Sequence, residues 1–155
     1  MGIDLAAKNK NPTGICVLNS KLSCFTVFKD EEILDLINKY KPLIVAIDAP
    51  LNIEIPFREA ERELIKRGFH VLPLSLKSMQ ELSLRAQKLI SKIKSKVIET
   101  FPRAVERILR FNYKLFKLYF RNKHEYDAWL CAIVAKLYYY GFYENLKGII
   151  LPKIK

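Results

Sequence analysis

Glycine, cysteine and tryptophan are scarce in this sequence, with five, three and one among 155 residues. There is no glycine-rich phosphate loop, serine-nucleophile motif or Cys-x-x-Cys pair, which argues against nucleotide kinases, triad hydrolases and zinc folds. Cys16, Cys24 and Cys131 have neither an even count nor metal-ligand spacing. This favours free, buried thiols in a cytosolic protein. Cys16 and Cys24 flank a predicted hairpin, so a bridge between them stays open.

Long apolar runs are also missing. No stretch approaches the roughly 20 apolar residues that span a bilayer, and the chain opens on a predicted strand rather than on a basic segment before an apolar one. We therefore expect a cytoplasmic protein without a membrane partner. Repeats, low-complexity tracts and linkers are absent as well, which predicts a single domain over residues 1–155.

Positive charge is abundant and unevenly distributed. The formal net charge is +11, and the stretch from Arg85 to Lys123 holds twelve basic residues against two acidic ones, a net +10. Such an asymmetry indicates an anionic partner, with nucleic acid as the first candidate. A solvated surface in a lysine-rich protein of hot-environment type remains the alternative.

Hydrophobic patterning predicts an α/β fold. Residues 1–6, 13–18 and 21–28 are predicted as an antiparallel meander, and 43–47 and 96–101 as two parallel strands. Helices are predicted at 31–40 (with Asp30 as N-cap), 57–67, 76–93, 103–110 and 125–140, while a helix at 113–120 and a terminal strand at 148–151 stay open. The resulting architecture is a mixed five-stranded sheet, three antiparallel then two parallel strands, with helices on both faces.

Four acidic residues interrupt or follow apolar segments: Asp4, Asp48, Glu99 and Asp127. A buried charge is costly unless something pairs with it. Hard oxygen ligands suit Mg²⁺ or Mn²⁺, and two such ions about 4 Å apart can activate water and steady the leaving oxygen of a phosphodiester. The pattern thus predicts a carboxylate metal site.

Each acid also has a structural interpretation. Asp4 could pair with a lysine, Asp48 could form a turn, and Glu99 could lie on the exposed face of an edge strand. Asp127 falls in the first turn of a predicted helix, where the dipole favours an acid. The small residues after it nevertheless predict close packing of this helix on the sheet, which would bring Asp127 near the end of the first strand: Ala128, Ala132 and Ala135. His124, three residues before Asp127, can face the same side as that acid, although such a histidine is also a common capping or packing residue.

Two further patterns concern contacts with nucleic acid. The candidate contact residues are Arg58, Arg62, Arg85 and Lys123. Glutamates interleave with Arg58 and Arg62, so an ion-paired helix face is an alternative to a phosphate clamp. Aromatic residues among the later lysines could stack on bases or pack in the core: Tyr113, Phe116, Tyr119 and Phe120.

Several short motifs occur in an order that resembles a known family. These are Gly2-Ile3-Asp4-Leu5-Ala6, Pro12-Thr13-Gly14, Val45-Ala46-Ile47-Asp48-Ala49-Pro50-Leu51, Arg58 with Glu61-Arg62, Ile98-Glu99-Thr100-Phe101-Pro102 and His124-Glu125-Tyr126-Asp127-Ala128. Together they resemble the predicted RNase H-like nuclease family catalogued as domain of unknown function 429, over nearly the whole chain.

The resemblance implies an RNase H-like fold in which Asp4, Asp48 and Asp127 bind metal. Glu99 matches the family's Glu-x-x-Pro motif as a fourth ligand or base, and His124 with Asp127 is similar to the arrangement in RuvC-type resolvases, where His124 would assist catalysis. The expected function is a Mg²⁺- or Mn²⁺-dependent nuclease acting on structured or hybrid nucleic acid. A non-catalytic nucleic-acid-binding module is the main alternative, and small-molecule phosphoryl transfer ranks third. RuvC-type enzymes act as dimers, so a homodimer stays open.

Overall fold

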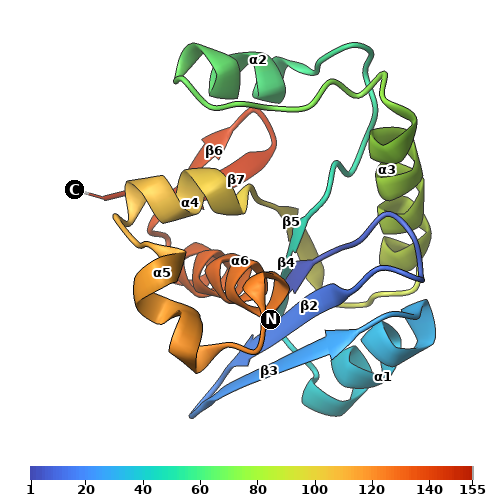
Figure 1. The fold of residues 1–155 in the computed structure, drawn as a ribbon, viewed down its shortest axis with the longest axis vertical. Coiled ribbons are helices and arrows are strands. Elements are labelled where there is room, and N and C mark those ends of the chain that lie inside the picture. The colour runs from blue at the N-terminus through green and yellow to red at the C-terminus, as the bar shows by residue number, and fades with distance from the viewer. Residues whose placement is uncertain (155) are drawn as a thin grey trace.

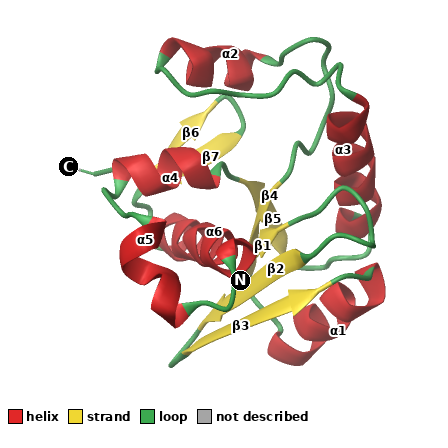
Figure 2. Cartoon of the chain, in the orientation of Figure 1, coloured by secondary structure: helices red, strands yellow, loops and turns green. Residues whose placement is uncertain are grey.

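The protein is an α/β sandwich built on one mixed sheet (Figures 1 and 2). The computed structural model describes residues 1–154. The strands are β1 (Gly2–Asp4), β2 (Thr13–Leu18), β3 (Leu22–Val27), β4 (Ile44–Asp48), β5 (Lys96–Glu99), β6 (Tyr143–Leu146) and β7 (Ile149–Pro152). The helices are α1 (Asp30–Tyr40), α2 (Glu59–Lys66), α3 (Lys77–Ile90), α4 (Pro102–Ile108), α5 (Tyr113–Phe116), the 3-10 helix η1 (Lys117–Tyr119) and α6 (Lys123–Tyr139).

The sheet has seven strands in the order β3-β2-β1-β4-β5-β7-β6, so the predicted count of five is wrong. Its first five strands do form an antiparallel meander followed by two parallel additions. β7 then pairs parallel to β5, and β6 pairs antiparallel to β7. The terminal strand left open is therefore β7, and β6 was missed.

The missed strand belongs to a tight hairpin. Leu146 pairs with Ile149, so the connection is the two residues Lys147 and Gly148, both with positive φ, 53° and 110°. Two-residue hairpins of this kind usually carry Asn or Asp with Gly. Here Lys147 occupies the first position, so the sequence lacks the usual Asn-Gly or Asp-Gly signal and keeps only its glycine, Gly148.

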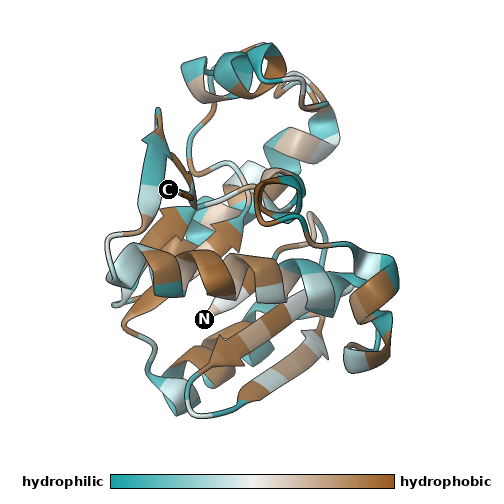
Figure 3. Ribbon diagram, turned by 90° about the vertical axis from the view of Figure 1, so that its left-hand side faces the viewer, coloured by the Kyte–Doolittle hydropathy of each residue, from teal (hydrophilic) through white to brown (hydrophobic). Residues whose placement is uncertain are grey.

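Helices cover both faces of the sheet. α4, α5 and α6 lie on one face, and α1 and α3 on the other (Figure 1). A hydrophobic core lies on each face of the sheet, and β4 contributes to both. Ala46 packs toward α6, while Val45 and Ile47 pack on the α1 side. A strand buried on both faces has no polar alternation, which accounts for its continuous apolar run. Figure 3 shows hydrophobic residues along the central strands and also along the helix that packs across them.

α6 lies unusually close to β1 and β2 because glycine faces it from each strand. A Cβ on Gly2 would stand 2.1 Å from the carbonyl oxygen of Ala128, and one on Gly14 would stand 2.0 Å from that of His124. The helix presents the buried alanines Ala128 and Ala132 at this contact. The predicted close packing of the last helix on the sheet is therefore confirmed.

This contact gives a first prediction. Gly14→Ala places a methyl group against backbone that cannot turn aside, so we expect a loss of about 1–3 kcal/mol in the free energy of unfolding. Urea denaturation followed by circular dichroism measures it. An unfolding midpoint equal to that of the wild type would show that α6 can retreat from β2 freely.

The cysteines differ from expectation. Cys16 and Cys24 lie directly opposite each other on β2 and β3, and they form a disulfide with a Cα–Cα distance of 4.2 Å. The expectation of free thiols is wrong for this pair because strand register, which the sequence spacing does not reveal, brings them together. Cys131 is free and buried, as expected. Within residues 1–154, no helix is long and apolar enough to cross a membrane.

Arg85 connects three segments from inside the protein. Its Nε donates to Asp30 at 2.8 Å, and its two terminal nitrogens donate to the carbonyl oxygens of Ala6 and Phe28 at 2.7 and 2.8 Å. Asp30, predicted as the N-cap of α1, is the first residue of that helix, and Lys29 occupies the cap position. Instead, the Glu32 carboxylate accepts from the Lys29 amide at 2.8 Å.

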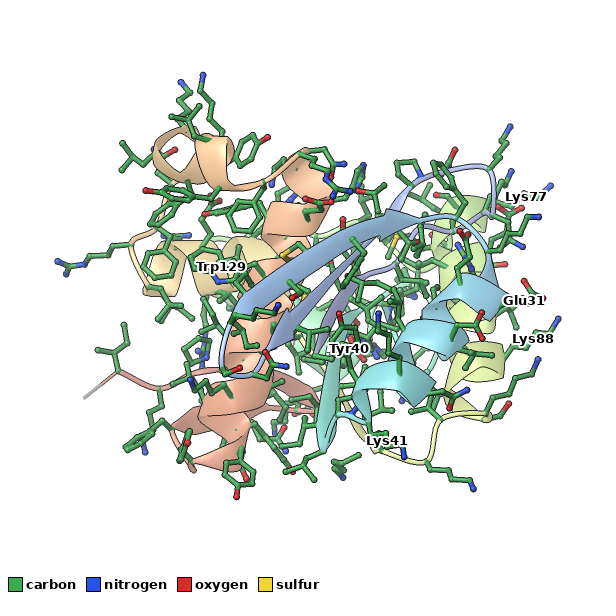
Figure 4. The ribbon with its side chains drawn as sticks, turned by 90° about the horizontal axis from the view of Figure 1, so that it is seen from below. Glu31, Tyr40, Lys41, Lys77, Lys88 and Trp129 are labelled. Carbon is green, nitrogen blue, oxygen red and sulfur yellow. A yellow bond between two sulfur atoms is a disulfide. The ribbon has the colours of Figure 1, made fainter. Side chains whose placement is uncertain are left out.

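Removing Arg85 should therefore weaken the fold. Arg85→Met leaves two carbonyls and a carboxylate without their donor, and we expect a loss of about 3 kcal/mol in the free energy of unfolding. Lys88→Met, on the exposed side of the same helix (Figure 4), should stay within about 0.5 kcal/mol of the wild type. Equal stability of the two variants in urea titration would contradict this role for Arg85.

Candidate functional site

Three adjacent parallel strands each end in an acidic residue: Asp4 ends β1, Asp48 ends β4 and Glu99 ends β5. Asp4 and Asp48 are register partners. The preceding pair, Ile3 and Ile47, packs on the α1 side of the sheet. Because side chains alternate along a strand, Asp4 and Asp48 both face α6, which carries His124 and Asp127.

Glu99 is out of phase with this pair. Its register partner is Ile47, so the pleat turns its side chain to the opposite face from Asp48. Arg58 donates to both Glu99 oxygens, at 2.9 and 2.5 Å, and the Leu51 amide donates at 3.0 Å. With both oxygens accepting, Glu99 is placed as an anchor for Arg58 rather than as a free base.

The carboxylates on the α6 face share one electrostatic environment. Burial raises the pKa of Asp48 well above its usual range, and the charges of Asp4 and Asp127 add to this rise, while Arg103 opposes it. Burial likewise raises the pKa of Asp127, against the favourable contact with Lys123. An acid pair and a third carboxylate from α6 are therefore near enough to repel one another.

Two exposed side chains from the first turn of α6, those of Lys123 and His124, contact the outer carboxylates. His124 Nδ1 lies 2.7 Å from Asp4 Oδ2, a contact that raises the pKa of the imidazole. Lys123 Nζ donates to both Asp127 oxygens, at 2.7 and 2.9 Å. For Asp48, the charge of Arg103 is the influence that lowers the pKa, against burial and the neighbouring carboxylates.

The start of α6 is fixed by a network that sequence reasoning missed. Asn122 caps the helix by accepting from the Glu125 amide at 3.0 Å. The buried Glu125 carboxylate in turn accepts from Thr26 Oγ1 and from the Arg121 amide, both at 3.0 Å. The Asn-x-x-Glu spacing is that of a capping box, which was the available signal. This network holds His124 and Asp127 against the sheet.

A second network surrounds Arg58; the sequence offered ion pairing with nearby glutamates as an alternative, but on a solvated face and without Glu99. Arg58 forms ion pairs with both Glu61 and Glu99, and its Nη1 donates to Asn52 at 2.6 Å. All three charged side chains are buried. The network ties the start of α2 to the end of β5.

The four basic residues proposed as nucleic-acid contacts fall into two groups. Arg58 and Arg85 are buried and their donors are engaged inside the protein, so contact with a phosphate backbone would require these bonds to break. Their assignment as nucleic-acid contacts is therefore corrected. The sequence alone does not show that these two arginines are buried. Arg62 and Lys123 are exposed, and Arg62 forms a long ion pair with Glu54, at 3.9 Å.

Hollows lie on either side of the acid pair. One, of about 320 Å³, is lined by Asp4, His124 and the β1–β2 loop. The other, of about 190 Å³, is lined by Asp48, Glu99 and Arg103 together with apolar residues. A larger hollow of about 390 Å³ opens at the other end of the strands, beside Met1 and Ile44, and contains none of these acids.

Whether the site fits a metal depends on both donors and arrangement. Asp4, Asp48 and Asp127 offer hard oxygens, the kind that Mg²⁺ and Mn²⁺ prefer. In the described part of the chain, residues 1–154, no three His, Cys, Asp or Glu side chains are grouped closely enough to hold an ion. The donor chemistry thus fits such a metal, but the present arrangement does not accommodate one, because the exposed Lys123 and His124 side chains contact Asp127 and Asp4 and would have to move away first.

Comparisons of this chain with protein-family models, with curated proteins and with solved structures found no match.

Proposed function

We propose that this protein is a divalent-metal-dependent nuclease that hydrolyses phosphodiester bonds of structured or hybrid nucleic acid. The observation that carries the proposal is the register of Asp4 with Asp48 at the ends of two parallel strands, on the face where α6 supplies Asp127 and His124. Ligand sites in open α/β sheets gather beyond the carboxyl ends of the strands. Clustered carboxylates repel one another there unless a cation compensates them.

In this proposal Asp4, Asp48 and Asp127 would hold Mg²⁺ or Mn²⁺. A bound divalent cation activates water and neutralises charge on the reacting phosphate. His124, which contacts Asp4, would be released when Asp4 takes the metal and would then donate a proton to the leaving oxygen. Lys123, released from Asp127, would contact a neighbouring phosphate.

The strand arrangement supports an RNase H-like fold as part of the proposal. The first five strands have the antiparallel-then-parallel arrangement that the sequence resemblance implies. β6 and β7 would then be an addition at the far edge. The proposal includes a cytoplasmic location. The Cys16–Cys24 disulfide is compatible with it, because intracellular proteins of hyperthermophiles carry disulfides. The lysine-rich composition is in keeping with such a source.

A non-catalytic nucleic-acid-binding module is the second candidate. One observation favours it: Lys123 and His124 already contact Asp127 and Asp4, so both acids have partners within the protein without a metal. In that case binding should weaken steeply with salt, and added Mg²⁺ or Mn²⁺ should produce no cleavage.

A substrate panel separates the two candidates. Single strand, duplex, RNA–DNA hybrid, flap and four-way junction would each be incubated with Mg²⁺, with Mn²⁺ and with chelator. The nuclease proposal expects metal-dependent cutting of at least one structured or hybrid substrate. Salt-sensitive binding of these substrates without cutting would instead favour the binding module.

A further inference from the structure

Residues Arg110–Arg121, which include α5 and η1, divide their large side chains between two sides; we call this segment the α5 lobe. Its inner aromatics are at least partly buried and pack on α6. Its outer apolar side chains are exposed: Leu115 at 74%, Leu118 at 89% and Tyr119 at 76%. The sequence analysis treated four aromatic residues as one group: Tyr113, Phe116, Tyr119 and Phe120. The structure separates them, because Tyr119 is exposed while the other three are at least partly buried.

The inner aromatics anchor the lobe. Phe111 stacks on Trp129 of α6 with ring centroids 5.3 Å apart and planes 15° from parallel. Phe120 lies 5.4 Å from the same ring, and Tyr113 lies 5.1 Å from Tyr126. Aromatic pairs at these separations are favourable beyond the area they bury. The outer side chains are therefore presented by a fixed backbone.

The charge around the exposed apolar side chains has one sign. Residues 107–124 contain six lysines and arginines and no acidic residue. Arg110, Lys114 and Lys117 are exposed, and among residues 1–154 they have no ion-pair partner. Such a surface suits a partner that offers negative charge and flat apolar faces together.

The lobe also adjoins the carboxylate site. Lys123 Nζ stands 5.7 Å from the centroid of the Tyr113 ring and 2.7 Å from Asp127. A polyanion bound along the lobe would therefore extend toward Asp127 and Asp4.

We propose that the α5 lobe is a docking surface for single-stranded nucleic acid, with Tyr119 and Leu118 against unstacked bases and Lys114 and Lys117 on phosphates. This inference rests on the proposed function, whose substrate it specifies. Aromatic platforms among cations are the common device of single-strand binding. In an intact duplex each base face is covered by its stacked neighbours. The exposed apolar side chains of the α5 lobe can therefore contact base faces only where strands are unpaired.

Trp129, the one tryptophan of the chain, provides a local reporter. It lies against the inner aromatics of the lobe and far from the Lys77 and Lys88 side chains of α3 (Figure 4). Titration with a single-stranded oligonucleotide should change Trp129 fluorescence, and anisotropy of a labelled oligonucleotide should give the Kd. The double variant Leu118→Ser with Tyr119→Ser should weaken binding about tenfold or more.

Charge is tested separately. Lys114→Glu with Lys117→Glu should reduce the slope of log K against log salt by about 1.4 or more, since each phosphate contact with a single strand contributes about 0.7. The matched controls are Leu84→Ser, also exposed at 62%, and Lys88→Glu, both on α3 at the opposite face of the sheet. These controls should bind as the wild type does, and all variants should keep the wild-type unfolding temperature because the changed side chains are exposed.

The outcomes distinguish failure of the lobe inference from failure of the nuclease proposal. If lobe and α3 variants bind equally well while metal-dependent cleavage persists, the lobe inference is overturned and the nuclease proposal stands. If cleavage is absent but lobe variants alone lose binding, the lobe inference stands and the nuclease proposal is lost. Absence of any oligonucleotide binding overturns both. A Trp129 response to phosphatidylserine vesicles that oligonucleotides do not compete would assign the lobe to anionic membranes and overturn the inference.

Discussion

Asp4→Asn is expected to lower metal-dependent cleavage by about 10³-fold or more, equivalent to about 4 kcal/mol of transition-state stabilisation. Asp4 is the carboxylate that both Asp48 and His124 adjoin, and it would be the central ligand of the proposed site. Asparagine keeps the size of the side chain but removes its charge. Initial rates on the substrate cut best by the wild type measure the effect.

The fold should survive this change. Asp4 lies at the end of a short strand, and its charge repels that of Asp48, so its loss should leave the unfolding temperature within a few degrees of the wild-type value. Asp35→Asn, on the exposed side of α1, is the matched control and should cut normally. Cleavage by Asp4→Asn at the wild-type rate would remove Asp4 from the mechanism.

Arg58→Ala is expected to have the largest effect on stability. It leaves the buried carboxylates of Glu61 and Glu99 without the guanidinium that they share. Removing one member of a buried ion-pair network costs about 3–5 kcal/mol. In a chain of this size that is roughly a 10 °C fall in the unfolding temperature, which differential scanning calorimetry would measure.

The neighbouring arginine on the same helix supplies the control. Arg62 is exposed, and its partner Glu54 stands 3.9 Å away, so Arg62→Ala should change stability by less than about 0.5 kcal/mol. If Arg58→Ala proved as stable as Arg62→Ala, the buried network would not be what fixes α2 to β5.

The carboxylate pair could be predicted because it depends on a local pattern. Asp4 and Asp48 each follow an apolar strand segment, and parallel neighbours bring such positions to the same end of a sheet. The placement of Asp127 followed from the small residues after it, which the glycines of β1 and β2 receive. These inferences needed only strand ends and side-chain size.

Other features depended on register and burial, which a single sequence does not fix. Glu99 looks equivalent to Asp48 along the chain, yet a register of Ile47 with Glu99 turns it to the other face. Arg58 and Arg85 are indistinguishable from surface arginines until their partners are placed. The Cys16–Cys24 bridge depends on cross-strand pairing in the same way.

The most direct test of the account is Mn²⁺ binding, followed by electron paramagnetic resonance of the free ion. The account predicts saturable binding by the wild type, loss of that binding in Asp48→Asn, and unchanged binding in the control Asp35→Asn. Metal binding to the folded state should also raise the unfolding temperature of the wild type and of Asp35→Asn, but not that of Asp48→Asn. Binding that is absent from the wild type, or that persists unchanged in Asp48→Asn, would contradict a metal site at the ends of β1 and β4.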